Sequence, residues 1–271
     1  MSLEGQFTEV GGYRTYYVRY GRGPAVVLLH GQSPGSCVEL IWGATIEPLA
    51  DAGFTVYAFD QVGFGRSDHP ADYSIGPRIA HTRAFLDAMG LDQAAFWTAS
   101  DGGYIASTIG LDDPRVSHLI IMANATLSPG APSDSEDSRR ERAEARAQYT
   151  PSIEEARKRL TRSIGDSSAV TDDLARVMYE ATSGKNFEAL QARQRAPRPP
   201  AIYDELHRLT IPVLLLWGLD DNHGGERSVM LLEKIPGAEL HLFDHSSQWP
   251  QRDHPQRSLA TVREFLRGGR P

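Results

Sequence analysis

The sequence predicts an α/β fold, in which a mostly parallel sheet is covered by helices on both faces and interrupted by a helical insertion. Two patterns in the 271 residues lead to this prediction. Short, continuously apolar runs recur along the chain, and helical patterns with short connections separate most of them. A third observation is the stretch at residues 124–210, which contains no such run.

The predicted strands begin with YRTYYVRY at Tyr13–Tyr20, where aromatic and polar residues mix as in an exposed antiparallel strand. Continuous hydrophobicity, as opposed to alternation, is typical of strands buried on both faces of a parallel sheet. Runs of this kind occur at residues 25–30, 54–59, 94–99, 118–123, 212–217 and 239–243. Helical patterns lie between them at residues 75–90 and 227–235 and after the last of them at residues 256–266, and Gly90 is expected to end the first.

The long stretch without apolar runs predicts a helical cap at residues 126–210, inserted into a core made of residues 1–125 and 211–271. Charged helical patterns occupy residues 139–149, 153–164 and 171–184, and the proline-rich residues 196–200 return the chain to the core. Apolar residues at helical spacing argue against a disordered linker, namely Leu160, Ile164, Leu174 and Met178.

Composition excludes several classes of function. A net charge of −7 argues against a general nucleic-acid or anionic-membrane binder. The single cysteine, Cys37, excludes an internal disulfide and a cysteine-cluster metal site. The sequence shows neither a signal peptide nor an apolar run of membrane-spanning length, so a cytoplasmic location is expected. No dinucleotide-binding or phosphate-binding glycine motif and no H-E-x-x-H motif is present, so neither an organic cofactor nor a metal is implied.

The first chemical signal is FWTASDGGYIAS at residues 96–107, where an apolar strand runs through a tight turn into a helix. This is the context of the G-x-S-x-G nucleophile elbow, with Thr98 in place of the first glycine and Ser100 as the nucleophile. The alternative is that Ser100 is only the N-cap of the helix.

Two further strand ends carry polar residues that fit such a nucleophile. The strand at residues 25–30 ends in His30-Gly31, and the next N–H, that of Gln32, could form an oxyanion hole with the N–H of Asp101. Asp221, with Asp220 in reserve, follows the strand at residues 212–217, where the acid of a catalytic triad is expected. Taken singly, both segments also fit ordinary loops.

The order and spacing of these segments resemble the α/β-hydrolase fold over nearly the whole chain. Residues 59–68 also match a family segment, and HGQSPG and SSQWPQRDHP are most similar to the meta-cleavage product hydrolases, which break carbon–carbon bonds in vinylogous diketones. The resemblance implies an eight-stranded sheet, a cap, a small-molecule substrate and no cofactor. It implies no nucleic-acid or membrane partner, and allows a homodimer. It also implies that Ser33, Ile41, Ala99 and Trp249 line the substrate pocket, with Ile41 and Ala99 replacing asparagines of the family.

The sequence departs from this family at the catalytic histidine. Trp249 and Gln251 align with the family pattern, so the histidine position holds Gln248. A neutral amide cannot take a proton from Ser100, although it could hydrogen-bond both Ser100 and Asp221. Loss of the base of a serine triad costs about 10⁶-fold in turnover. His245, on the same loop, is the candidate for a surrogate base, but it would need a loop rearrangement.

Three hypotheses follow from the sequence. In the first, the chain is a serine hydrolase of C–C or ester bonds, in which a glutamine has replaced the histidine of the parent form. In the second, it catalyses a reaction that needs no triad base, such as a cyclisation, elimination, retro-aldol cleavage or cofactor-free oxygenation. In the third, it only binds a small molecule between cap and core.

Overall fold

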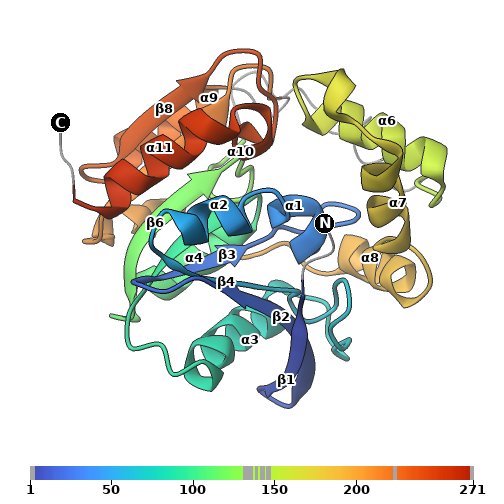
Figure 1. Cartoon of the computed structure of the whole chain (residues 1–271), viewed down its shortest axis with the longest axis horizontal. Coiled ribbons are helices and arrows are strands. Elements are labelled where there is room, and N and C mark those ends of the chain that lie inside the picture. Colours follow the sequence, from blue (N-terminus) through green and yellow to red (C-terminus); the bar gives the residue numbers. More distant parts are fainter. Residues whose placement is uncertain are drawn as a thin grey trace.

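Eight strands form a single, mostly parallel sheet, as the sequence predicts (Figure 1). The computed structural model describes residues 4–130, 137, 140, 144, 148–221 and 225–268. The strand order is β1-β2-β4-β3-β5-β6-β7-β8, and only the β1–β2 and β2–β4 pairs are antiparallel. The strands are β1 (Gln6–Val10), β2 (Tyr13–Tyr20), β3 (Ala25–Leu29), β4 (Thr55–Phe59), β5 (Ala94–Ala99), β6 (Val116–Met122), β7 (Val213–Gly218) and β8 (Glu239–Phe243).

The sheet separates two apolar cores, which explains why its parallel strands are continuously hydrophobic. In β3, Val26 and Leu28 belong to one core, while Val27 and Leu29 belong to the other. The first core is closed by α1 (Val38–Trp42), α2 (Ile46–Asp51) and α11 (Pro255–Leu266), and α10 (Pro250–Asp253) packs against α11. The second is closed by α3 (Ile75–Ala88), α4 (Gly102–Gly110) and α9 (Gly225–Lys234).

The N-terminal hairpin differs from the prediction in two respects. The strand β1 was not predicted, and β2 is antiparallel but not exposed along its length. Thr15, Tyr16 and Val18 are buried, because β2 lies between β1 and β4 instead of at the edge of the sheet.

The segment between β6 and β7 is helical wherever the structure describes regular elements in it, and its helices α6, α7 and α8 lie to one side of the core (Figure 1). It contains α6 (Ile153–Ser163), η1 (Ser167–Ala169), α7 (Asp172–Glu180), α8 (Lys185–Arg195) and η2 (Tyr203–Arg208). Ser152 and Thr171 cap α6 and α7 by accepting backbone N–H groups. The helix expected at residues 139–149 falls mostly outside the described residues, and α8 was not predicted.

The helices α6, α7 and α8 are called the cap below, and α6 and α7 pack on the core through apolar side chains. Leu160 and Ile164 from the α6 region and Met178 from α7 are buried in the same cluster as Val38 and Ile41 of α1. No helix in the described ranges is long and apolar enough to cross a bilayer.

The six strands from β3 to β8 form a parallel array, so their carboxyl ends meet at one edge of the sheet. The loops that leave this edge carry Gln32 after β3, Ser100 after β5, Asp221 after β7 and Gln248 after β8. In open α/β sheets this edge is where ligands bind.

Candidate active site

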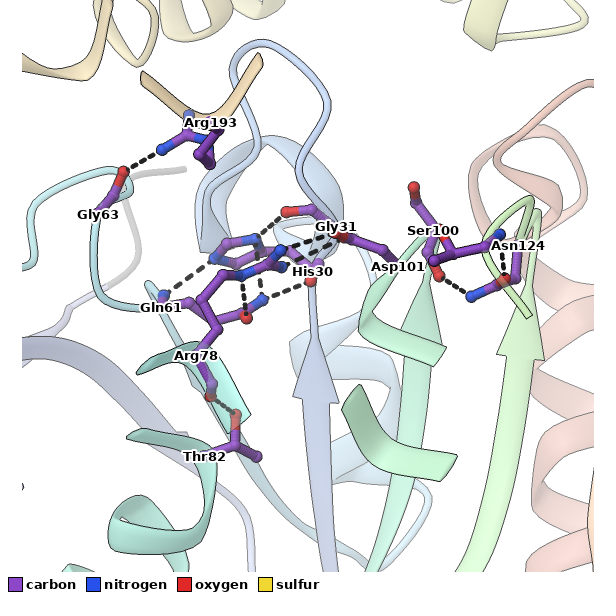
Figure 2. A network of polar contacts seen from close by, with 11 residues as sticks. His30, Gly31, Gln61, Gly63, Arg78, Thr82, Ser100, Asp101, Asn124 and Arg193 are labelled. Atoms are coloured by element: carbon purple, nitrogen blue, oxygen red, sulfur yellow. Dashed lines mark hydrogen bonds and ion pairs between the residues drawn. The ribbon is translucent and has the colours of Figure 1, made fainter. Parts of the chain in front are cut away.

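Ser100 occupies a sharp turn between β5 and the helix α4. Its φ is 52°, in the left-handed region that residues with a side chain rarely adopt. The turn is held because the Ser100 N–H donates to the Met122 carbonyl at 2.9 Å, and the Ser100 carbonyl accepts the Gly103 N–H at 3.0 Å. Figure 2 shows the Ser100 side chain pointing out past the end of β5. A serine on a sharp strand-to-helix turn of this kind is typical of a nucleophile elbow.

Glycines allow the neighbouring segments to approach this turn. A Cβ on Gly31 would lie 2.4 Å from the Ser100 Cβ, and one on Gly102 would lie 2.6 Å from the Leu29 carbonyl oxygen. Thr98, in place of the first glycine of the motif, donates its hydroxyl to the Ile120 carbonyl at 2.9 Å. The loop after β3 therefore lies directly against the nucleophile turn, as an oxyanion hole requires.

The two N–H groups expected to form the oxyanion hole are available for a ligand. Within the described part of the chain, neither the Gln32 N–H nor the Asp101 N–H donates to a protein acceptor. The Gln32 side chain is exposed, and the carbonyl of the next residue, Ser33, accepts the Ser36 N–H at 2.9 Å.

The carboxylate of Asp101 does not face a ligand. It accepts two hydrogen bonds from the Arg78 guanidinium, at 2.7 and 3.2 Å, and the two side chains are only 1% and 4% exposed. Arg78 also donates from Nε to Oε1 of Gln61 at 2.9 Å. Because the charge of Asp101 is paired with a cation, it opposes an anion at the neighbouring N–H less than a lone carboxylate would.

Asp221 and Gln248 lie on adjacent loops. Asp221 is buried, at 4% exposed, whereas Asp220 is exposed and donates its N–H to the Ser246 carbonyl at 2.9 Å. Gln248 faces the cap: its N–H donates to the Ser163 carbonyl at 3.1 Å, and its Oε1 lies 3.5 Å from the Ser163 hydroxyl. Among the described hydrogen bonds none joins Gln248 to Ser100 or Asp221.

His245 lies on the protein surface. Its φ is 50°, its side chain is exposed, and its carbonyl faces Gly165 of the cap. His254, between α10 and α11, is bound through Nε2 to the Asp244 carbonyl at 2.7 Å. His223 falls outside the described residues.

The remaining residues expected in the pocket belong to the apolar core beneath the cap. Ile41, Ala99 and Trp249 are buried in the same cluster as Met178 of the cap helix α7. No cluster of three or more histidine, cysteine or acidic side chains that could hold a metal ion occurs in the described ranges.

Sequence reasoning missed the polar residues that surround the nucleophile turn: Gln61, Arg78 and Asn124 (Figure 2). Asn124 and Gln61 follow the ends of β6 and β4, so their position at the carboxyl edge was a signal. Arg78 gave no local signal, because its partner Asp101 is 23 residues away.

These features are the ones expected of a serine hydrolase on an α/β core, and a family comparison gives the same class. A model described as "Alpha/beta hydrolase family" matches residues 26–261, and the chain belongs to this family.

Curated relatives and solved structures cover almost the whole chain. It is 29% identical to a 2-hydroxymuconate semialdehyde hydrolase of Pseudomonas putida, over 98% of this chain and 97% of the relative. It is 30% identical to a 2-hydroxy-6-oxononadienedioate/2-hydroxy-6-oxononatrienedioate hydrolase of Burkholderia vietnamiensis, over 94% and 91%. A meta-cleavage product hydrolase of Pseudomonas fluorescens, complexed with acetates, superposes with a TM-score of 0.85 at 30% identity, over 97% and 98%.

Proposed function

We propose that this chain acts on a small carbonyl-containing organic compound, with Ser100 directed at the carbonyl carbon and the Gln32 and Asp101 N–H groups at its oxygen. The observation that carries the proposal is the turn at Ser100. Its φ of 52° presents the hydroxyl beside two N–H groups that have no protein acceptor among the described residues. Such groups stabilise the negative charge that develops on a carbonyl oxygen during nucleophilic attack.

The names of the relatives support a carbonyl substrate. One is named a hydrolase of a semialdehyde and another a hydrolase of 6-oxo dienedioates and trienedioates. We propose that the Gln248→His variant, which carries the family's histidine on the loop after β8, hydrolyses a C–C or ester bond next to such a carbonyl group.

Gln248 limits this chemistry in the chain as it stands. Attack by Ser100 requires removal of the hydroxyl proton, and an amide has no basic nitrogen to take it. Loss of the base in a serine triad costs about 10⁶-fold in turnover. Slow hydrolysis is therefore expected from the unchanged chain.

The orientation of Gln248 favours a second candidate function. Gln248 contacts Ser163 of the cap, while the Gln32 and Asp101 N–H groups meet no protein acceptor in the part of the chain that the structure describes. A substrate that carries its own acidic proton needs no triad base, and its carbonyl could still be polarised here. The candidates are a cyclisation, an elimination, a retro-aldol cleavage or a cofactor-free oxygenation, with ligand binding alone as the remaining option.

Labelling with a fluorophosphonate probe tests the main proposal. The Ser100 hydroxyl displaces fluoride from phosphorus, and the rate reports the reactivity of the nucleophile. We expect slow labelling of the unchanged chain and rapid labelling of Gln248→His, lost in Gln248→His/Ser100→Ala. Gln248→Asn is the matched control, because it changes the side chain without supplying a base.

Other outcomes separate the alternatives. Rapid labelling of the unchanged chain at Ser100 would identify a surrogate base, and His245→Asn would then test that residue. No labelling of Ser100 in any variant would overturn the proposal and favour the base-free reaction or ligand binding.

A further inference from the structure

Each of the two N–H groups of the candidate oxyanion hole belongs to a peptide group whose carbonyl is held by a buried side chain. The carbonyl of Gly31, in the same peptide group as the Gln32 N–H, accepts from Nδ1 of His30 at 2.8 Å. The carbonyl of Ser100, in the same peptide group as the Asp101 N–H, accepts from Nδ2 of Asn124 at 2.5 Å. In a planar trans peptide the N–H points opposite to the C=O, so fixing the carbonyl fixes the direction of the N–H.

The hydrogen-bond partner of the second ring nitrogen determines which nitrogen of His30 carries the hydrogen. The backbone N–H of Gln61 donates to Nε2 of His30 at 3.0 Å, so Nε2 must be unprotonated and Nδ1 carries the hydrogen. The Gln61 side chain also donates from Nε2 to the His30 carbonyl. Burial lowers the pKa of His30 to about 3, so the ring stays neutral and keeps this tautomer at ordinary pH.

The orientation of the Asn124 amide is equally determined. Its Oδ1 accepts the N–H groups of Thr126 and Leu127, both at 2.8 Å. The amino group is therefore the end that faces Ser100, and it can only donate to the Ser100 carbonyl. Asn124 is fully buried, so water does not compete for this contact.

Gln61 and Arg78 connect His30 and Asp101 in one hydrogen-bond network (Figure 2). Gln61 contacts His30 on the loop after β3 and accepts from Arg78, and Arg78 pairs with Asp101 at the start of α4. The loop and the helix are thereby tied together behind the two N–H groups.

We propose that His30 and Asn124 are positioning residues, which aim the Gln32 and Asp101 N–H groups at one point through the carbonyl ends of their peptide groups. The inference rests on the proposed function only for what the oxyanion hole does; the orientation itself is a property of the folded chain. It predicts an oxyanion hole that is formed before any ligand binds.

The first test compares two replacements of His30 in the Gln248→His background. His30→Asn places an amide nitrogen near the position of Nδ1 and keeps a donor for Gly31, whereas His30→Gln loses that donor. Loss of one oxyanion-hole donor costs about 10²–10³-fold in rate. We expect the phosphonylation rate of Ser100 to fall by at least about 10-fold in His30→Gln and to be largely restored in His30→Asn.

Thr55→Val is the control for a lost hydrogen bond from a side chain to a backbone carbonyl. Thr55 donates to the Gly23 carbonyl at 2.7 Å at the amino edge of the sheet, and valine has nearly the same shape. It should lower the melting temperature without changing the labelling rate. Equal rates in the parent, His30→Gln and His30→Asn would overturn the inference.

A second test uses the unchanged chain and needs no reactive serine. Hydrogen bonding at a carbonyl polarises its whole peptide group, so the ¹⁵N shift of the Gln32 amide should move in His30→Gln and return in His30→Asn. The ¹⁵N shift of the Asp101 amide should change in Asn124→Ala, and neither shift should change in Thr55→Val. If Ser100 is not labelled in Gln248→His, the proposed function fails while these shifts still decide the positioning role. An unchanged ¹⁵N shift of the Gln32 amide in His30→Gln would refute the positioning role of His30.

Discussion

The buried ion pair between Arg78 and Asp101 predicts a large loss of stability when only one partner is removed. Its charged atoms are 2.7 and 3.2 Å apart and almost fully shielded from solvent. Arg78→Met keeps an apolar chain in place but leaves the Asp101 carboxylate buried without its cation. Breaking a buried pair in this way costs about 3–5 kcal/mol. At roughly 2–4 °C per kcal/mol for a domain near this size, the melting temperature should fall by about 6–20 °C.

A double-mutant cycle measured by urea unfolding isolates the pair itself. Arg78→Met and Asp101→Leu should each be strongly destabilising, whereas the combined variant should lose much less than the sum, because no uncompensated charge then remains buried. Free energies of unfolding that simply add would refute the argument that the two charges depend on each other.

Three further predictions concern the surroundings of the site. Gly31→Ala places a Cβ 2.4 Å from the Ser100 Cβ. In the Gln248→His background, fluorophosphonate should therefore label Ser100 of the folded variant at least about 10²-fold more slowly. An unchanged labelling rate would contradict the close packing. Burial raises the pKa of Asp60 to about 6 in the folded chain. The contribution of Asp60 to the free energy of unfolding is therefore fully present below about pH 4 and is lost as the pH rises toward 6, by up to about 1.4 kcal/mol per pH unit. Denaturation at several pH values should show a smaller pH slope in this window for Asp60→Asn, and an identical slope would exclude Asp60 as the cause. The Arg193 side chain donates to the Gly63 carbonyl at 2.6 Å and lies 3.8 Å from the centre of the Phe64 ring. Arg193→Met removes this hydrogen bond, which contributes roughly 1 kcal/mol. Amide hydrogen exchange in α8 should therefore become about 5–10-fold faster. Unchanged exchange would show that this contact does not hold the helix.

The parallel strands could be predicted because burial on both faces leaves a continuous apolar run that is visible in sequence. The strand β1 could not, because QFTEV is short and Phe7 is exposed. The helix α8 was missed for a related reason: of its 11 residues only Ala189 and Leu190 are buried, so its apolar stripe is too weak to recognise.

In the candidate site, too, the features encoded by neighbouring residues could be predicted and those that depend on distant residues could not. The turn at Ser100 is encoded locally by a strand, small residues and a helix, so its motif could be recognised. The partners of Gln248 and Arg78 depend on tertiary structure, since Ser163 is 85 residues from Gln248 and Asp101 is 23 from Arg78. No local pattern indicates that Gln248 contacts the cap or that Asp101 has a buried cation.

The two N–H groups that face the nucleophile turn belong to the main chain, and this has a consequence for mutagenesis. Alanine scanning removes side chains and leaves every backbone N–H in place. Gln32→Ala would report only on an exposed side chain, and Asp101→Ala would report on the ion pair with Arg78. A scan of this kind would therefore leave both N–H groups of the proposed oxyanion hole untested and would mark the residues that hold their peptide groups as essential. Replacing a peptide bond by an ester, which deletes a single N–H, addresses these groups directly.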